Sequence, residues 1–152
     1  MTILVTGGAG FIGTNFILSW LDQGGGRVIN LDKLTYAGNA DNLSHLPPES
    51  YLLIGGDIGD FDLALDLLRE YKPAAVVNFA AESHVDRSIH SPHEFVNTNV
   101  LGTFRLLEAV RAYGAELSTE LAESFRFLHV STDEVFGSLG PDEAPFSETT
   151  AY

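Results

Sequence analysis

Short apolar runs alternate with longer segments of helical spacing along the chain. Helical spacing is found at 13–22, 61–71 and 92–113, and a shorter helix is expected at 117–124. The apolar runs are rich in Val, Ile, Leu or Phe, which is typical of strands buried on both faces of a sheet; they are 3–6, 28–31, 51–54, 75–79 and 127–130. Because strand and helix alternate, the pattern predicts an α/β fold with a doubly wound parallel sheet.

The longest helical segment, 92–113, has a clearly marked start. Ser91 is expected to be the N-cap, Pro92 suits the first helical position, and Glu94 completes a capping box. Apolar residues along the segment approximate one stripe, the pattern of an amphipathic helix. They are Phe95, Val96, Leu101, Phe104, Leu107 and Val110.

The size and composition of the chain limit its possible functions. Its 152 residues suffice for one domain, and 45% of them are hydrophobic, without a run near the length of a membrane span. Lys and Arg number 8 against 21 Asp and Glu, and the resulting charge of −13 argues against nucleic-acid and membrane partners. The absence of cysteine and of a basic N-terminal signal region favours a cytoplasmic location.

A glycine-rich turn follows the first predicted strand. Residues 5–13 read VTGGAGFIG, so the motif is either Gly8-x-Gly10-x-x-Gly13 or Gly7-x-x-Gly10-x-x-Gly13. Such glycines allow a tight bend, let the backbone approach a pyrophosphate, and bring the helix close to the sheet. A tight turn without a ligand is the simpler alternative, because glycine-rich turns are common. The place between a strand and a helix favours the dinucleotide-binding fingerprint.

An acidic residue stands where the second predicted strand ends. Asp32 lies about 20 residues beyond the glycines, where a carboxylate accepts hydrogen bonds from ribose hydroxyls. A carboxylate there disfavours a 2′-phosphate, so NAD is expected rather than NADP, although the neighbouring Lys33 could weaken that preference. Asp57, at the end of the third strand, either reaches an adenine edge or is a plain turn residue. Together these residues predict the nucleotide-binding half of a Rossmann fold.

Two adjacent carboxylates follow the fifth predicted strand, in the sequence Ser131-Thr132-Asp133-Glu134. One interpretation is structural, with Ser131 as an N-cap and Glu134 completing a capping box. The other is catalytic, because ligands of such folds bind at the carboxyl edge of the sheet. Adjacent carboxylates in a partly dry cleft hold one proton between them, so one serves as general acid and the other as general base. Beside a pyridine nucleotide, the pair indicates redox chemistry coupled to elimination.

Six motifs occur in the order and at the spacing typical of one enzyme family. They are TGGAGFIG, LDKLTYAGN, AAESHVDRSI, NTNVLGT, STDEVFG and ETTAY, and they cover essentially the whole chain. In these motifs the chain resembles the nucleoside-diphosphate-sugar dehydratases of the extended short-chain dehydrogenase/reductase family. The STDEV sequence resembles the members that dehydrate a glucose nucleotide, whereas GDP-mannose dehydratases look like STSE here and epimerases usually lack the acid pair.

The resemblance implies an NAD-dependent lyase of deoxysugar biosynthesis that acts on a nucleotide sugar. The sugar is oxidised at C4, loses water across C5 and C6, and is reduced at C6. By this resemblance Asp133 protonates the departing C6 hydroxyl, Glu134 removes the C5 proton, and Thr132 contacts the substrate near its 4-oxygen. Ser83 is implied to touch both cofactor and substrate. The glycine motif and the resemblance together assign further cofactor contacts to Gly7, Gly10, Phe11, Ile12, Gly13, Asp32, Lys33, Leu34, Thr35, Asp57, Ile58, Phe79, Ala80, Ala81, Glu82 and Thr98.

The family pattern continues past the last residue of this chain. The catalytic Tyr-x-x-x-Lys pair of the family lies a little beyond the ETTAY match, and Tyr152 aligns with a non-catalytic tyrosine. Residues 1–152 are therefore expected to be a truncated NAD-binding Rossmann domain, inactive alone, of a chain about twice as long that adds a C-terminal substrate domain. A thymidine or a uridine nucleotide on the sugar, an epimerase, and a non-catalytic NAD-binding module all stay open.

Several other motif residues are expected to be structural. Asn99 matches a family position of mostly architectural role, and His84, Asp86 and Arg87 are assigned to local structure. The segment 92–113 is a candidate half of a homodimer interface in the full-length form. The histidines have no metal-ligand spacing, so no metal site is expected.

Overall fold

A five-stranded parallel sheet forms the centre of the molecule. The computed structural model describes the backbone of residues 1–152 and every side chain except that of Val85. The strands are β1 (Thr2–Thr6), β2 (Arg27–Asp32), β3 (Tyr51–Gly55), β4 (Ala75–Asn78) and β5 (Arg126–His129), in the order β3-β2-β1-β4-β5. This is the order of the first five strands of a doubly wound Rossmann-type sheet, so the predicted fold class is confirmed.

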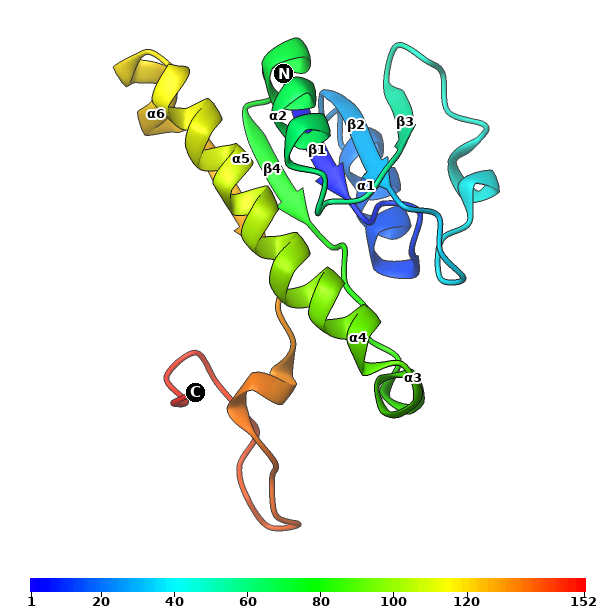
Figure 1. Ribbon diagram of the computed structural model, residues 1–152, viewed down its shortest axis with the longest axis vertical. Helices are drawn as coiled ribbons and strands as arrows, with labels where there is room; N and C mark the ends of the chain where they lie inside the picture. Colours follow the sequence, from blue (N-terminus) through cyan, green and yellow to red (C-terminus); the bar gives the residue numbers. More distant parts are fainter.

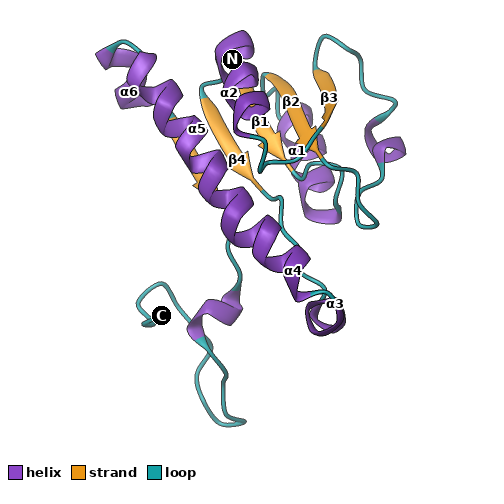
Figure 2. Cartoon of the chain, in the orientation of Figure 1, coloured by secondary structure: helices purple, strands orange, loops and turns teal.

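Helices connect the strands and cover both faces of the sheet (Figure 1). The α-helices are α1 (Phe11–Asp22), α2 (Phe61–Tyr71), α3 (Val85–His90), α4 (Pro92–Phe95), α5 (Thr103–Glu116) and α6 (Thr119–Ser124). Shorter segments are the 3₁₀ turns η1 (Ala40–Leu43) and η3 (Asp133–Phe136) and the π-helix η2 (Val96–Gly102). Figure 2 shows α4 and α5 as parts of one long helix, and the C-terminal loop segment extending away from the sheet.

The two faces of the sheet are built by alternate residues of its strands. Ile3 and Val5 of β1 pack with Ile17 of α1, whereas Leu4 packs with Leu106 of α5 in a separate cluster. Each of these side chains is at most 2% exposed. Successive side chains of a strand point to opposite faces, so both helical layers are held by the same strand. Burying each such side chain contributes about 1.5–3 kcal/mol.

Strand β5 is less buried than its apolar sequence predicted. It pairs with β4 and stands last in the strand order. Phe127 packs against the α2 and α5 layer, but Leu128 and Val130 are 54% and 37% exposed. The prediction of a strand buried on both faces is therefore wrong for β5, because within the described chain no helix covers the face to which Leu128 points.

The long helical segment differs from the single amphipathic α-helix that was predicted. A π-helix, η2, lies between α4 and α5 and widens the turn over seven residues. The side chains that pack on the sheet are Leu106, Ala109 and Tyr113. The predicted stripe lies largely on the solvent side, with Val96, Leu101, Phe104 and Leu107 between 43% and 58% exposed. The stripe is thus an exposed apolar surface and not the contact with the core.

Helix starts also differ from the sequence prediction in detail. Ser91 is the N-cap of α4 with Pro92 in the first turn, as predicted, but no side-chain cap hydrogen bond is made there. The backbone N–H of Glu94 donates to the Ser91 carbonyl at 3.2 Å, so the predicted capping box is wrong. Helix α1 starts two residues before the predicted 13–22, because Gly10 already serves as its N-cap.

Replacing Leu106 by alanine should destabilise the fold strongly. Leu106 is fully buried between α5 and the sheet, so Leu106→Ala removes packed methyl groups and leaves a cavity. The free energy of unfolding, measured by chemical denaturation, should fall by about 2–5 kcal/mol. Leu121→Ala on α6 is the matched control, since Leu121 is 56% exposed. Equal losses in the two variants would contradict the assigned core.

Candidate functional site

The carboxyl ends of the parallel strands bring most of the predicted site residues to one edge of the sheet. The glycine turn follows β1 and Asp32 ends β2, while Asp57 comes shortly after β3. Residues 79–83 follow β4, and residues 131–134 follow β5. Ligands of doubly wound sheets bind outside this edge.

The glycine turn is shaped by two close backbone approaches. Gly7 has φ +69°, and a Cβ atom there would lie 2.6 Å from the backbone N of Ala80. A Cβ on Gly13 would lie 2.6 Å from the Cα of Gly8, so the first turn of α1 sits directly against the glycine turn. Only glycine fits either position without a shift of backbone. The tight bend and the close helix expected from the sequence are both present.

The N-terminus of α1 faces this edge and is not capped by a side chain. Gly10 is the N-cap, and the first turn contains no acidic residue. The first N–H groups of an α-helix have no partner within the helix, so they can bind an anion. Phe11 and Ile12, which supply two of these groups, have exposed side chains. This end of α1 has the donors and the space that a pyrophosphate needs.

Two buried asparagines form hydrogen bonds to the glycine turn and to the end of β1, and neither was predicted from the sequence. The Oδ1 atom of Asn30 accepts from the N–H of Gly8 at 2.9 Å, and its Nδ2 donates to the hydroxyl of Tyr51 at 2.9 Å. Asn78 accepts from the hydroxyl of Thr6 and contacts the Nδ1 atom of His129 at 2.9 Å. A side-chain amide in a buried strand needs hydrogen-bond partners. Asn30, a polar residue within the apolar run VINLD, was therefore a sign in the sequence that such partners exist.

Asp32 is a buried carboxylate at the centre of the site. It is 8% exposed and accepts two backbone hydrogen bonds, from Ala9 at 2.8 Å and from Leu34 at 2.8 Å. A carboxylate has about four acceptor positions, so both oxygens can still accept from ribose hydroxyls. The sequence analysis predicted the ribose contact but not that Asp32 ties the glycine turn to the loop after β2.

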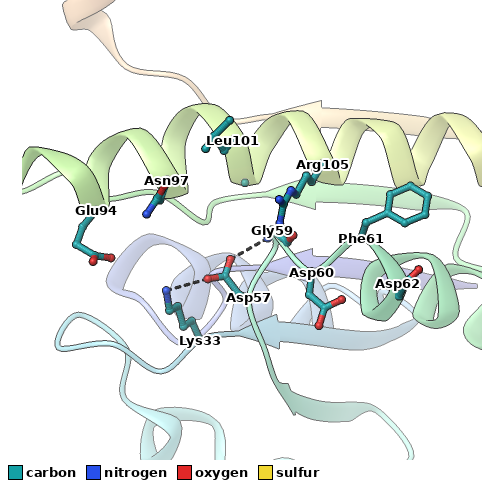
Figure 3. Close-up of a pocket in the computed structure, with 11 residues that line it drawn as sticks. Lys33, Asp57, Gly59, Asp60, Phe61, Asp62, Glu94, Asn97, Leu101 and Arg105 are labelled. Carbon is teal, nitrogen blue, oxygen red and sulfur yellow. Dashed lines mark hydrogen bonds and ion pairs between the residues drawn. The ribbon is translucent and has the colours of Figure 1, made fainter.

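Lys33 and Asp57 form an ion pair beside a cavity of about 590 Å³. Their Nζ and Oδ2 atoms are 2.8 Å apart, as the dashed line in Figure 3 marks. On the other side of the cavity, Arg105 of α5 donates to the carbonyl of Gly59 at 3.0 Å. Because Lys33 is paired with Asp57, its charge is not free for a 2′-phosphate. The geometry therefore supports the expected preference for NAD.

The ion pair changes the pKa values of both its members. The hydrogen bond to Asp57 raises the pKa of Lys33 more than burial lowers it. Burial raises the pKa of Asp57, but the hydrogen bonds from Lys33 and from the Gly59 N–H, with the nearby positive charges, outweigh it and leave the pKa below its ordinary 3.8. The pair thus adds stability above pH 3.8 that is lost as the pH falls through the lowered pKa of Asp57.

The remaining adenine-side residues lie between β3 and the long helix. Ile58 is buried, and a Cβ on Gly102 would lie 3.1 Å from its Cγ1 atom, so the helix approaches closely here. Thr98, on the π-helix η2, is half-buried, as is Thr35 in the loop after β2. Ile58 therefore lies beside Asp57, whereas Thr35 lines a separate cavity with Tyr36 and Glu82.

Residues 79–83 form the wall of the site after β4. Asn99 holds the backbone of Glu82 by accepting from its N–H and donating to its carbonyl, both at 2.8 Å. This double hydrogen bond accounts for the architectural role expected of Asn99. The ring of Phe79 packs against that of Phe16 on α1, with centroids 5.2 Å apart. Ala81 and Ser83 are exposed and open to a ligand.

Tyr36 and Arg87 form a contact that the sequence analysis missed. The Tyr36 hydroxyl donates to Oε2 of Glu82 at 3.1 Å, and the Arg87 guanidinium carbon lies 3.7 Å from the centroid of the Tyr36 ring. The assignment of Arg87 to local structure is therefore wrong, because its partner is 51 residues away in the chain. The motifs LDKLTYAGN and AAESHVDRSI contain these residues, but the sequence gives no information on how their side chains pair.

The acid pair lies on η3, after β5, away from the cavity beside Lys33. Thr132 is the N-cap, and its hydroxyl accepts from the N–H of Glu134 at 3.3 Å. The predicted capping box is therefore wrong, because the N-cap is Thr132 and not Ser131. Asp133 and Glu134 are both exposed, so the expected dry cleft is not present in the described chain. The orange segment of Figure 1 shows why, since η3 extends away from the sheet.

An aromatic cluster organises the segment around the acid pair. The ring of Phe136 stacks on that of Tyr152, with centroids 5.2 Å apart and 11° between the ring planes. Phe146 packs against the same ring, with centroids 5.2 Å apart. The chain therefore folds back on itself beside η3, and Tyr152 contacts Phe136.

Neither a metal site nor a membrane span is found in the part of the chain that the structure describes. The described side chains contain no group of three or more His, Asp or Glu residues placed to bind a metal ion. Of the described helices, none is long and apolar enough to cross a membrane.

Comparison with known families places the chain. The family model described as GDP-mannose 4,6 dehydratase matches residues 4–152. The chain belongs to the GDP-mannose 4,6 dehydratase family. This membership confirms the resemblance to nucleotide-sugar dehydratases that the six motifs predicted.

Individual relatives within this family are more specific. A curated dTDP-glucose 4,6-dehydratase of Xanthomonas campestris pv. campestris (strain B100) is 57% identical over 99% of the chain. A dTDP-glucose 4,6-dehydratase from Streptomyces venezuelae, crystallised with NAD, has a TM-score of 0.82 at 42% identity over 99% of the chain. A UDP-glucose-4-epimerase from Stenotrophomonas maltophila, also with NAD, gives 0.80 at 28% identity over 99% of the chain. The chain spans 43%, 45% and 42% of these proteins, respectively.

Replacing Lys33 by methionine should raise the pKa of Asp57. Lys33→Met removes the hydrogen bond and the charge that hold this pKa low, and it leaves the effect of burial. The Asp57 carboxyl resonance, followed by NMR against pH, should then titrate above its wild-type pKa. Lys72→Met is the control, since Lys72 caps the far end of α2. An unchanged Asp57 titration in Lys33→Met would contradict the pairing.

Proposed function

We propose that this chain is the NAD-binding part of a dTDP-glucose 4,6-dehydratase. This hydro-lyase converts dTDP-glucose into dTDP-4-keto-6-deoxyglucose and water, with NAD as a catalytic cofactor, in deoxysugar biosynthesis. The observation that carries the proposal is the position of Thr132-Asp133-Glu134 at the carboxyl end of β5, on the same edge as the glycine turn. The 57% identity to a dTDP-glucose 4,6-dehydratase supports the choice of substrate.

The residues at this edge fit NAD by their own geometry. Gly7 lets the glycine turn lie directly against the backbone of Ala80, and α1 offers uncapped N–H donors for a pyrophosphate. Asp32 presents its carboxylate to the ribose position. The cavity beside Asp57 suits the adenine. The cofactor roles of all these residues are part of the proposal.

The acid pair supplies the proton transfers of the elimination. The chemistry that NAD would supply when bound is hydride transfer, from C4 of the glucose and back to C6. Glu134 takes the proton from C5, which the C4 ketone makes acidic, while Asp133 gives a proton to the departing C6 hydroxyl. Water leaves as a C5–C6 double bond forms, and Glu134 would return its proton to C5 as the hydride reaches C6. The proton of the C4 hydroxyl would go to the catalytic tyrosine expected beyond residue 152. Thr132 orients the substrate near its 4-oxygen. Ser83, which is exposed after β4, would contact both the cofactor and the substrate.

An epimerase is the nearest alternative on fold alone, since a UDP-glucose-4-epimerase has a TM-score of 0.80 with this chain. Epimerisation eliminates no water, so it gives no role to a carboxylic acid at Asp133. The acid pair therefore favours dehydration. We propose that the two-part organisation expected from the sequence also holds, with residues 1–152 inactive alone. The cytoplasmic location stays a prediction.

Removing either carboxyl charge of the acid pair should depress the elimination. In the complete protein, Asp133→Asn and Glu134→Gln should each slow the formation of dTDP-4-keto-6-deoxyglucose by about 10²–10⁴-fold, because each removes a positioned proton donor or acceptor. Reduction of bound NAD by dTDP-glucose, followed by absorbance, should persist in both variants.

The matched controls are Asp142→Asn and Glu148→Gln, which change exposed acids in the following loop. They should dehydrate at the wild-type rate. If Asp133→Asn and Glu134→Gln also did so, the pair would be no more than a cap of η3, and the proposed function would fail.

We propose that the full-length protein is a homodimer formed through the exposed apolar surface of η2 and α5. This surface consists of Val96, Val100, Leu101, Phe104 and Leu107, all large and exposed. They recur at intervals of one to four residues along one long helix. A contiguous exposed apolar surface of this kind is typical of a protein interface.

A charge placed on this surface should break the dimer. Phe104→Asp buries an unpaired carboxylate in the interface, so sedimentation of the complete protein should shift from dimer towards monomer. Leu139→Asp is the control, because Leu139 is similarly exposed but lies in the loop after η3. A Phe104→Asp variant that sediments as wild type would exclude this surface as the interface.

A further inference from the structure

The loop after β2, residues 33–39, is fastened to the sheet at both of its ends. At its start the N–H of Leu34 donates to Asp32 at 2.8 Å, and Leu34 has φ +54°. At its end the N–H of Asn39 donates to the carbonyl of Ala9, in the glycine turn, at 2.9 Å. The loop therefore forms a strap beside the glycine turn, with its middle free to reach across the edge of the sheet.

Tyr36, in the middle of the strap, contacts the opposite wall of the site. Its hydroxyl donates to the carboxylate of Glu82 at 3.1 Å, and the backbone of Glu82 is itself fixed by Asn99. Arg87 of α3 covers the ring of Tyr36 at 3.7 Å, which is cation–π geometry. Three separate segments thus meet at one tyrosine.

The contact lines a second cavity, of about 360 Å³, between the strap and the wall. Residues on both sides of the contact belong to the predicted cofactor site: Lys33 and Thr35 from the strap, and Glu82 from the wall. The pKa of Tyr36 is raised above its ordinary value. The larger cause is desolvation, and the second is the hydrogen bond to Glu82. The hydroxyl therefore keeps its proton at neutral pH and stays the donor to Glu82.

We propose that Tyr36 and Arg87 are positioning residues that hold the strap against Glu82 and slow the release of NAD. The inference rests on the proposed function, in which NAD is regenerated in every cycle and has no need to leave. The chain has a formal charge of −13, so long-range electrostatics oppose a bound anionic dinucleotide. Retention must then come from contacts within the site, and the hydrogen bonds of the strap to Asp32, Ala9 and Glu82 hold the strap beside that site.

The test is the rate at which NAD leaves the complete protein. Tyr36→Phe removes only the hydroxyl, and Arg87→Ala removes the covering guanidinium. Each should speed NAD dissociation about fivefold, the effect of losing one hydrogen bond or one cation–π contact at a partly exposed site. Arg87→Lys keeps a cation over the ring and should restore part of the retention. In both Tyr36→Phe and Arg87→Ala, the KM for added NAD should rise by a larger factor than kcat falls.

Tyr71→Phe is the matched control for Tyr36→Phe. Tyr71 also bonds a carboxylate, that of Glu70, and has Arg27 at 5.7 Å from its ring centroid. It lies at the end of α2 that precedes β4, at the opposite edge of the sheet. Tyr71→Phe should therefore release NAD at the wild-type rate, and a matching Tm for all the cofactor-free variants would exclude a general loss of folding.

Each outcome decides a different question. Faster NAD release in Tyr36→Phe and Arg87→Ala, with wild-type release in Tyr71→Phe, supports the role of Tyr36 and Arg87 in holding the strap. Release within twofold of wild type in both Tyr36→Phe and Arg87→Ala overturns the inference while leaving the proposed function intact. A wild-type protein that binds no NAD overturns the proposed function, and the inference with it.

Discussion

The arrangement of the site depends on one buried carboxylate, that of Asp32. Burying a charge costs free energy unless hydrogen bonds replace its hydration, and the N–H groups of Ala9 and Leu34 supply that replacement. These bonds connect the end of β2 to the glycine turn and to residues 33–39. The glycine turn, the loop after β2 and the proposed pyrophosphate and ribose positions therefore all depend on the same side chain. A change at Asp32 would alter all of them together.

Much of the fold could be predicted because strand burial is visible in local sequence. The apolar runs around Leu4, Ile29 and Val76 correctly gave the parallel strands, since each is buried by helices on both faces. The prediction failed where burial depends on the neighbours of an element. Leu128 has the sequence of a core strand residue but lies on the outermost strand. The π-helix η2 also left no local signal, and the residues of α5 that pack on the core, Leu106, Ala109 and Tyr113, are not those of the predicted stripe.

The candidate site divides in the same way. The glycines, Asp32 and the acid pair could be placed from sequence because each follows directly from the end of a strand. The partner of Tyr36 could not, because Glu82 is 46 residues away and only the folded sheet brings their segments together. The burial of the acid pair was also predicted from a general expectation for strand ends. It failed because η3 projects from β5 with both carboxylates in solvent.

The two parts of the site therefore differ in how firmly they are built. The cofactor side is fixed by buried hydrogen bonds to backbone groups, from Asn30 to Gly8 and from Asp32 to Ala9, which do not depend on any ligand. The acid pair is held by one 3₁₀ turn and by the stacking of Phe136 on Tyr152. The proposed elimination needs both carboxylates placed to within a hydrogen-bond length of the sugar. The contacts that fix Asp133 and Glu134 must therefore come from whatever covers η3, and bound substrate is one such cover.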